Sequence, residues 1–134
     1  MDQRLLNLYC DPYFYFHQCV EFSDFVVVTA WNPRSIPQWN WDNVENNQRL
    51  LAEINHTDCY RVSVGNTDFS WWEESYAVDI PLSDALAIGN SFDQNAIYCV
   101  EDENLFLVLC LNGQRIHLGS WRQRCVKNFS ERLK

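Results

Sequence analysis

The stretch Phe25–Ser35, read as FVVVTAWNPRS, constrains the fold of this chain more than any other. Its first four residues are aromatic or β-branched, which is the composition of a strand that is buried on both faces of a sheet. Pro33 cannot continue a central strand because it has no amide hydrogen to donate. The stretch therefore predicts a central strand over residues 25–31, followed by polar side chains that lie at an edge of the sheet.

Length and composition indicate one folded domain with a hydrophobic core. The chain has 134 residues, of which 47% are hydrophobic and 15% are aromatic. Cys125, Phe129 and Leu133 are spaced four residues apart with basic residues between them, which predicts a basic amphipathic helix at the end of the chain. The predicted parts of the domain are an N-terminal segment over residues 1–12, an α+β core over 13–121 and the basic helix over 122–134.

Acidic and basic residues are unevenly distributed along the chain. The formal net charge is −8, but the last thirteen residues hold five bases and one acid, so the 121 residues before them carry −12. A body this acidic repels nucleic acid and anionic lipid and attracts basic proteins. We therefore predict a basic protein partner, no direct contact with nucleic acid and no membrane association. The alternative is that the charge serves only to keep the domain soluble.

The six cysteines are predicted to be free thiols. No C-x-x-C pair occurs, four of the six lie in apolar or aromatic runs, and Met1–Tyr9 lacks the apolar centre of a signal peptide. These features favour a reducing compartment, and we expect a cytoplasmic location. No apolar run approaches the roughly 18 residues that a membrane-spanning helix requires.

Hydrophobic alternation and turn signals define the predicted elements. From residue 25 onward their order is β-α-β-β-α-β, followed by two more strands. This order is typical of the ferredoxin-like fold, a split β-α-β arrangement in which two helices cover one face of an antiparallel sheet. We therefore predict an α+β fold with a ferredoxin-like core, extra strands at both ends and a C-terminal helix. The predicted strands cover residues 13–20, 25–31, 59–64, 74–80, 95–100, 105–111 and 114–121, and the predicted helices cover 42–55 and 83–92.

Four spaced motifs carry a resemblance to a known family. They are Thr29-Ala30-Trp31-Asn32-Pro33 with Ser35, Asn46-Asn47 with Leu50, Glu74-Ser75, and Gln94-Asn95-Ala96-Ile97. In this order they resemble an uncharacterised bacterial family, a domain of unknown function with a T-A-x-N-P-x-S segment, an E-S pair and a Q-x-A element. The similarity covers about residues 9–111. It implies no activity, but it marks these positions as ones to consider together.

Polar side chains at the ends of predicted elements form a candidate ligand site. A split β-α-β fold can bring these ends to one edge of the sheet, where amide, hydroxyl and carboxylate groups can hydrogen-bond a small ligand such as a base or an amide. The alternative is a structural role, because Asn32 and Ser35 can form turns around Pro33 and Gln94 can close a helix end. The candidate residues are Asn32, Ser35, Glu74, Ser75 and Gln94.

Tryptophans and acids in or beside predicted loops form a candidate docking surface. Exposed tryptophan is a frequent anchor of protein interfaces, because a large rigid ring buries area at little cost in entropy. The alternative is that the rings cover one end of the sheet as a small satellite core. The candidate tryptophans are Trp39, Trp41, Trp71 and Trp72, and the candidate acids are Glu73, Glu101, Asp102 and Glu103.

Two functions are therefore open, and a third possibility is a purely structural subunit. The first is a small acidic interaction module that binds a basic, nucleic-acid-handling protein, by analogy with anti-CRISPR-like inhibitors carried by phage and mobile elements. The second is a small-ligand-binding or hydrolytic domain built on the five polar residues above.

No catalytic, metal or cofactor site is predicted. The serines and the three histidines lack the G-x-S-x-G motif that marks a serine nucleophile. Glu73 and Glu74 are adjacent on a predicted strand and point to opposite faces, so they do not form an acid–base pair. His17 and Cys19 can share one face of a strand, but no second pair of metal ligands matches them.

Overall fold

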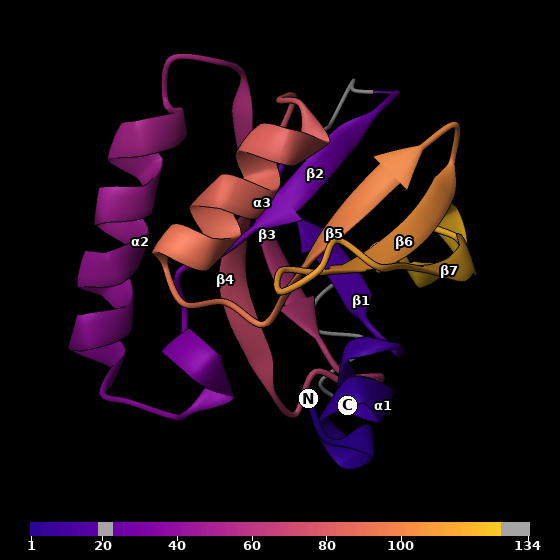
Figure 1. The fold of residues 1–134 in the computed structure, drawn as a ribbon, viewed down its shortest axis with the longest axis horizontal. Coiled ribbons are helices and arrows are strands. Elements are labelled where there is room, and N and C mark those ends of the chain that lie inside the picture. Colours follow the sequence, from indigo (N-terminus) through magenta and orange to yellow (C-terminus); the bar gives the residue numbers. More distant parts are fainter. Residues whose placement is uncertain (19–22, 127–134) are drawn as a thin grey trace.

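The computed structural model describes residues 1–18 and 23–126 of the chain. Within this part, three α-helices pack against one seven-stranded sheet (Figure 1). The helices are α1 (Gln3–Tyr9), α2 (Asn40–Ile54) and α3 (Leu82–Ser91). The strands are β1 (Tyr13–Phe16), β2 (Phe25–Val28), β3 (Cys59–Gly65), β4 (Trp72–Val78), β5 (Ala96–Glu101), β6 (Asn104–Leu109) and β7 (Arg115–Ser120). Short 3-10 turns lie at Pro33–Ser35 and Arg122–Arg124.

The strand β2 lies at the centre of the sheet, as its composition predicts. The strand order is β1-β3-β4-β2-β5-β6-β7, and all neighbouring strands are antiparallel. Val26 and Val28 belong to a hydrophobic core on one face, and Phe25 and Val27 belong to a second core on the other face. All four residues are buried because both faces of the sheet are covered at this strand.

The sheet curls into a half-barrel around one of these two cores. The ring of Phe14 in β1 meets the ring of Tyr98 in β5 edge-on, with 5.5 Å between the ring centroids. Three strands separate β1 from β5 in the sheet, so this contact requires strong curvature. Edge-to-face aromatic contacts extend the same core to Trp121, and α1 packs against it. We call this concave side the inner face.

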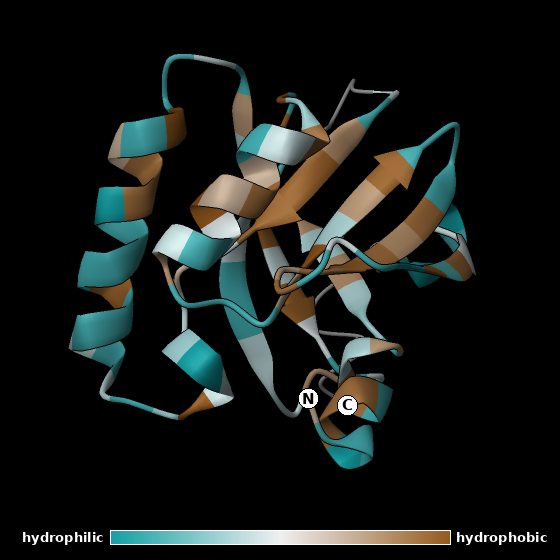
Figure 2. Cartoon of the chain, viewed as in Figure 1, coloured by the Kyte–Doolittle hydropathy of each residue, from teal (hydrophilic) through white to brown (hydrophobic). Residues whose placement is uncertain are grey.

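The helices α2 and α3 cover the opposite, outer face of the sheet (Figure 1). Leu50 and Ile54 of α2 and Ala85 of α3 are fully buried in the outer core. Burial of a leucine or isoleucine side chain stabilises a fold by about 1.5–3 kcal/mol. Figure 2 shows hydrophobic residues concentrated on β2, β5 and β6, whereas much of the surface of α2 is hydrophilic.

The predicted ferredoxin-like core of two helices on one face is wrong. The described residues hold three helices, and their seven strands form one antiparallel half-barrel with a core on each face. The physical reason is that β1, β6 and β7 also carry apolar side chains on the inner face, and the sheet covers these by curling over itself and against α1. The coarser prediction of a mixed α+β fold is confirmed.

The ends of the predicted elements also need correction. The predicted C-terminal helix over residues 122–134 is not formed in its described part, where a 3-10 turn at Arg122–Arg124 ends at an extended Cys125 that pairs with Phe14; residues 127–134 lie outside the described part. The first predicted strand ends at Phe16, and its residues 19–20 lie outside the described part as well. Helix α2 begins at Asn40, two residues before the predicted cap at Asp42, which instead lies in the first turn, where a carboxylate favours the helix dipole.

Gly89 allows α3 to pack closely on the sheet. A Cβ atom at this position would lie 2.7 Å from Sγ of Cys110 and 3.1 Å from Cγ2 of Ile97. We expect Gly89→Ala to lower the free energy of unfolding by about 1–2 kcal/mol, because overpacking outweighs the better helix propensity of alanine. Urea unfolding followed by circular dichroism measures this change. Ser91→Ala, at an exposed position of α3, is the matched control, and equal stability of the two variants would contradict the close packing.

Candidate functional site

The chain leaves β2 through a turn with unusual backbone geometry. Asn32, Arg34 and Ser35 have positive φ angles of 43°, 58° and 61°. Residues other than glycine rarely adopt such angles, which cost on the order of 1 kcal/mol each. The amide of Arg34 donates to the carbonyl oxygen of Asp93 at 2.7 Å, and the amide of Ser35 donates to that of Asn32 at 2.8 Å. These bonds hold a turn from which Asn32 and Ser35 line a cavity.

Two buried asparagines of α2 fix the end of β2. Oδ1 of Asn43 accepts from the amide of Asn32 at 2.7 Å, and Nδ2 of Asn43 donates to Oδ1 of Asn32 at 2.9 Å. Asn47 accepts from the amide of Ala30 at 2.9 Å and donates to the carbonyl oxygen of Glu74 at 2.9 Å. Both asparagines are almost completely buried, so these bonds satisfy backbone groups that water does not reach.

A cavity of about 370 Å³ lies between α1, the turn at Pro33–Ser35 and the inner face of the sheet. Ligand pockets in proteins have volumes of about 300–1,000 Å³ and combine apolar walls with a few polar groups that orient the ligand. The apolar walls include Leu5, Leu8, Pro12, Pro37, Val64 and Trp71. The polar side chains include Tyr9, Asn32, Ser35, Glu73 and Tyr98. We call it the Glu73 cavity.

Hydroxyl and amide groups beside this cavity are joined by hydrogen bonds. The hydroxyls of Tyr9 and Ser35 bond to each other, and Nδ2 of Asn95 donates to Oγ of Ser35 at 3.0 Å. The hydroxyl of Tyr98 donates to the carbonyl oxygen of Tyr9 at 2.6 Å. Burial raises the pKa of Tyr9 and holds that of Tyr98 well above its usual range, so both phenols are neutral at physiological pH.

Glu73 is the residue of this cavity that ionises near neutral pH. Its cross-strand neighbour is Val64, which packs against the inner core, so the Glu73 side chain leaves β4 on the apolar inner side. Desolvation by burial raises the pKa of the Glu73 carboxyl to about 7, and a hydrogen bond with Asn32 offsets part of this rise. The carboxyl can therefore present either a donor or an acceptor at neutral pH.

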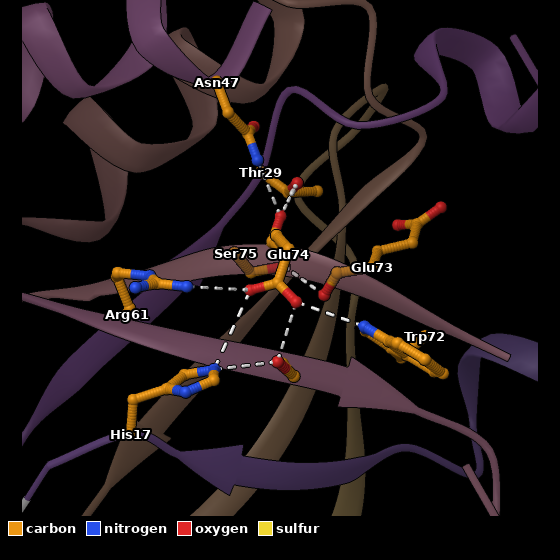
Figure 3. Close-up of polar contacts among 9 residues, drawn as sticks. His17, Thr29, Asn47, Arg61, Trp72, Glu73, Glu74 and Ser75 are labelled. Atoms are coloured by element: carbon orange, nitrogen blue, oxygen red, sulfur yellow. Dashed lines mark hydrogen bonds and ion pairs between the residues drawn. The ribbon is translucent and has the colours of Figure 1, made fainter. Parts of the chain in front are cut away.

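The structure does not bring the five predicted ligand residues into one cluster. Asn32 and Ser35 both line the Glu73 cavity. Glu74 does not, because adjacent side chains on β4 leave the strand in different directions, as Figure 3 shows for Glu73 and Glu74. The carboxylate that accompanies Asn32 and Ser35 is therefore that of Glu73.

The other two predicted ligand residues make hydrogen bonds within the protein. Ser75 is buried, and its hydroxyl donates to the carbonyl oxygen of Glu73 at 3.4 Å. Gln94 is also buried, and its Nε2 donates to the carbonyl oxygens of Trp31 at 3.2 Å and Phe92 at 3.3 Å. Gln94 thus connects the end of α3 to the segment that follows β2 by hydrogen bonds.

Glu74 lies in a polar cluster on the outer face (Figure 3). Its Oε1 accepts from Oγ of Ser63 at 3.0 Å and from Nε1 of Trp72 at 3.1 Å. Its Oε2 lies 3.8 Å from Nε2 of His17 and 4.0 Å from Nη2 of Arg61. Both distances are longer than a hydrogen bond, and Oε2 is a buried oxygen without a hydrogen-bond partner among the described residues.

The predicted docking tryptophans are exposed and form two groups. Trp39 and Trp41, at the start of α2, are each 74% exposed, and their ring centroids lie 6.4 Å apart. Trp71 and Trp72, at the start of β4, are 53% and 38% exposed. Large exposed aromatic rings therefore lie at both places.

The predicted docking acids are less uniform. Glu101 pairs with Arg115 at 2.8 Å, and Glu103 pairs with Nε of Arg122 at 2.5 Å. Asp102 between them is exposed. The remaining acid, Glu73, lies in the cavity described above. Two of the three charges in the turn at residues 101–103 are therefore compensated within the chain.

No metal centre is visible in residues 1–18 and 23–126, where no three His, Cys, Asp or Glu side chains gather. His17 shares a hydrogen bond with Ser63 at 3.0 Å, and Cys19 lies outside the described residues. The described cysteines are free thiols: Cys10, Cys59, Cys99, Cys110 and Cys125. None of the described helices has the length and apolar composition that crossing a membrane requires.

Two residues of the cavity are not recognisable from the sequence pattern, and a third is only weakly indicated. Tyr9 and Tyr98 are far apart in the chain, and only the curl of the sheet brings α1 over β5. Glu73 carries a weak signal, because it alternates along β4 with Ser75 and Ala77, and two small residues at these positions indicate a buried face.

Comparison with known proteins places the chain in a family. Residues 28–97 match the sequence model of a family described as a protein of unknown function (DUF3293), which is more than half of the 134 residues. The chain belongs to this family. The predicted membership of a family of unknown function is thus confirmed, and the matched DUF3293 region includes Asn32, Ser35 and Glu73. No curated protein and no solved structure matches the chain.

Proposed function

We propose that this domain binds a small molecule in the Glu73 cavity. The observation that carries the proposal is the Glu73 carboxyl, which has a pKa of about 7 and faces an apolar cavity. Ionisable groups with strongly shifted pKa values in apolar clefts are characteristic of binding and catalytic sites. The hydroxyl pair of Tyr9 and Ser35 supplies further hydrogen-bonding groups beside it.

The chemistry of the lining favours a flat ligand with an amide or a nitrogen heterocycle. Such a ligand presents a donor and an acceptor side by side, which a carboxyl group can match with its two oxygens. The apolar walls, with Trp71 and Val64 among them, favour a ring over a highly charged group. An anionic ligand is disfavoured because it would meet the Glu73 carboxylate above pH 7.

Binding is favoured over hydrolysis at this cavity. Among the described residues, the hydrogen-bond partners of Ser35 Oγ are Tyr9 and Asn95. The Tyr9 phenol is neutral and an amide is no base, so these two partners do not activate the serine as a nucleophile.

The cavity also supports ligand binding more directly than the acidic turn supports docking. Glu101 and Glu103 already pair with arginines of the chain, which leaves less charge there to attract a partner.

A thermal-shift screen of nucleobases, nucleosides and aromatic amides tests the proposal. We expect at least one compound to raise the melting temperature of the protein. Calorimetry with that compound should show that Glu73→Gln and Ser35→Ala each weaken binding roughly tenfold or more. The reason is that each substitution removes a hydrogen bond in a desolvated site. The matched control is Glu74→Gln, the neighbouring carboxyl on the outer side of β4, which should change the affinity by less than about threefold. Equal losses in Glu73→Gln and Glu74→Gln would contradict the proposal, as would a complete absence of stabilisation across the screen.

A further inference from the structure

We propose that a second cavity, on the outer side of β4, is a docking site for an arginine side chain of a basic protein partner. This cavity has a volume of about 490 Å³ and lies between the start of α2 and the loop that joins β3 to β4. Three tryptophans are among its lining residues, Trp31, Trp71 and Trp72. We call it the tryptophan cleft.

The charge of the tryptophan cleft suits a cation. Glu74 is among its lining residues, and those within residues 1–18 and 23–126 include no lysine, arginine or histidine. Oε2 of this carboxylate is buried without a hydrogen-bond partner among the described residues, where Nε2 of His17 lies 3.8 Å from it and Nη2 of the largely exposed Arg61 lies 4.0 Å from it. The net charge of −8 adds a long-range attraction for a basic partner.

Hydrogen bonds hold the side chains of Trp72, Glu74 and Gln38 in place before a partner arrives. Nε1 of Trp72 donates to Oε1 of Glu74 at 3.1 Å, which fixes the indole beside the carboxylate (Figure 3). Gln38, another lining residue, donates from Nε2 to Oδ1 of the buried Asn43 at 2.7 Å. This bond leaves Oε1 of Gln38 as an acceptor for an incoming donor. Preorganised groups of this kind lower the entropy cost of binding.

Arginine fits these groups better than lysine does. A guanidinium is planar, is less strongly hydrated than an ammonium and stacks on indole rings while its N–H groups donate sideways to amide and carboxylate oxygens. An ammonium offers a point charge without a face to stack. Nucleic acid is disfavoured as the occupant, because its phosphates would meet an acidic surface.

The two cavities are neighbours, so the test must use residues that line only one of them. Asn32, Pro37 and Trp71 line both cavities. Trp72 and Glu74 line the tryptophan cleft and not the Glu73 cavity. Trp41 is exposed and lines neither cavity, which makes it a matched tryptophan control.

The experiment measures binding of a short arginine–serine repeat peptide by tryptophan fluorescence and calorimetry. We expect the same peptide with citrulline, which is neutral and of the same shape, to bind roughly tenfold more weakly or worse, and the lysine peptide to fall between the two. Trp72→Ala and Glu74→Gln should each weaken arginine-peptide binding roughly fivefold or more, with Trp41→Ala and Glu73→Gln within about twofold of wild type. Circular dichroism of each variant confirms that it is folded.

Several outcomes would overturn this docking site. Equal binding of the arginine and citrulline peptides would show that charge is not recognised. Equal losses in Trp41→Ala and Trp72→Ala would place the contact outside the cleft. Binding of an oligothymidylate in preference to the peptide would assign the rings to base stacking. A folded protein that binds none of these peptides would refute it without bearing on the Glu73 cavity.

Discussion

Replacing Asn47 with alanine is expected to lower the free energy of unfolding by about 2–4 kcal/mol. Asn47 is only 5% exposed, and its amide joins α2 to the end of β2 and to β4 by two hydrogen bonds of 2.9 Å. Alanine would leave the amide of the fully buried Ala30 without a partner, which costs about 1–3 kcal/mol, and a small void adds to this. The carbonyl oxygen of Glu74 would keep the hydroxyl of Thr29 as a donor at 2.7 Å.

Urea unfolding followed by tryptophan fluorescence measures this loss. Asn46→Ala is the matched control, because Asn46 precedes Asn47 in α2 and its Oδ1 accepts an exposed hydrogen bond from Arg49. We expect the control to change stability by less than about 0.5 kcal/mol. Similar losses of unfolding free energy in both variants would mean that the hydrogen bonds of Asn47 do not stabilise the packing of α2 on the sheet.

Replacing Glu73 with glutamine is expected to stabilise the protein at alkaline pH and to leave it nearly unchanged at acidic pH. Burial raises the pKa of the Glu73 carboxyl from 4.5 to about 7. The folded state therefore holds the proton more tightly than the unfolded state. The resulting stabilisation is complete below pH 4.5 and is lost as the pH rises through about 7. At about pH 8.5 the ionised carboxylate lowers the free energy of unfolding by up to about 3 kcal/mol, which glutamine avoids.

Urea unfolding of both proteins at about pH 5 and about pH 8.5 checks this prediction. The quantity of interest is the difference between wild type and Glu73→Gln, since other groups titrate equally in both. Glu45→Gln, an exposed carboxyl of α2, is the control and should show no pH-dependent difference from wild type. If the free energies of unfolding of wild type and Glu73→Gln differed by the same amount at both pH values, this would contradict a buried carboxyl with a raised pKa.

The central strand could be predicted from the sequence because its cause is local. The four consecutive residues Phe25–Val28 are aromatic or β-branched, so neither face of this strand is polar. Both faces must be buried, and this favours a position in the middle of the sheet. The break at Pro33 is local as well. The turn that follows was predicted for its Asn and Ser side chains, and the structure places Asn32 and Ser35 together at one cavity.

The half-barrel could not be predicted in the same way because it depends on contacts between distant strands. Whether Phe14 meets Tyr98 is decided by the summed twist of the strands between them, which no short window of sequence contains. In the predicted ferredoxin-like core, helices cover only one face of the sheet. The apolar side chains of β1, β6 and β7 on the inner face would then be exposed to water. Curling of the sheet, with α1 against it, covers them.

The cavity shows the same division between local and distant causes. Alternation on β4 predicts that Glu73 and Glu74 point in opposite directions, and they do (Figure 3). Which of the two faces the cavity depends on the pairing of Glu73 with Val64 of β3, and this register is a tertiary property. The carboxylate predicted for the ligand site was Glu74, whereas the one in the cavity is its neighbour.

Titration of the Glu73 side-chain carboxyl by carbon-13 nuclear magnetic resonance is the most direct test of the ligand cavity. The carboxyl resonance can be assigned by its disappearance in Glu73→Gln. We expect it to titrate with a pKa of about 7, because the group lies on the apolar inner side of β4. A pKa near the ordinary value of 4.5 would mean that water reaches the carboxyl freely, and it would contradict the cavity on which the proposed function rests.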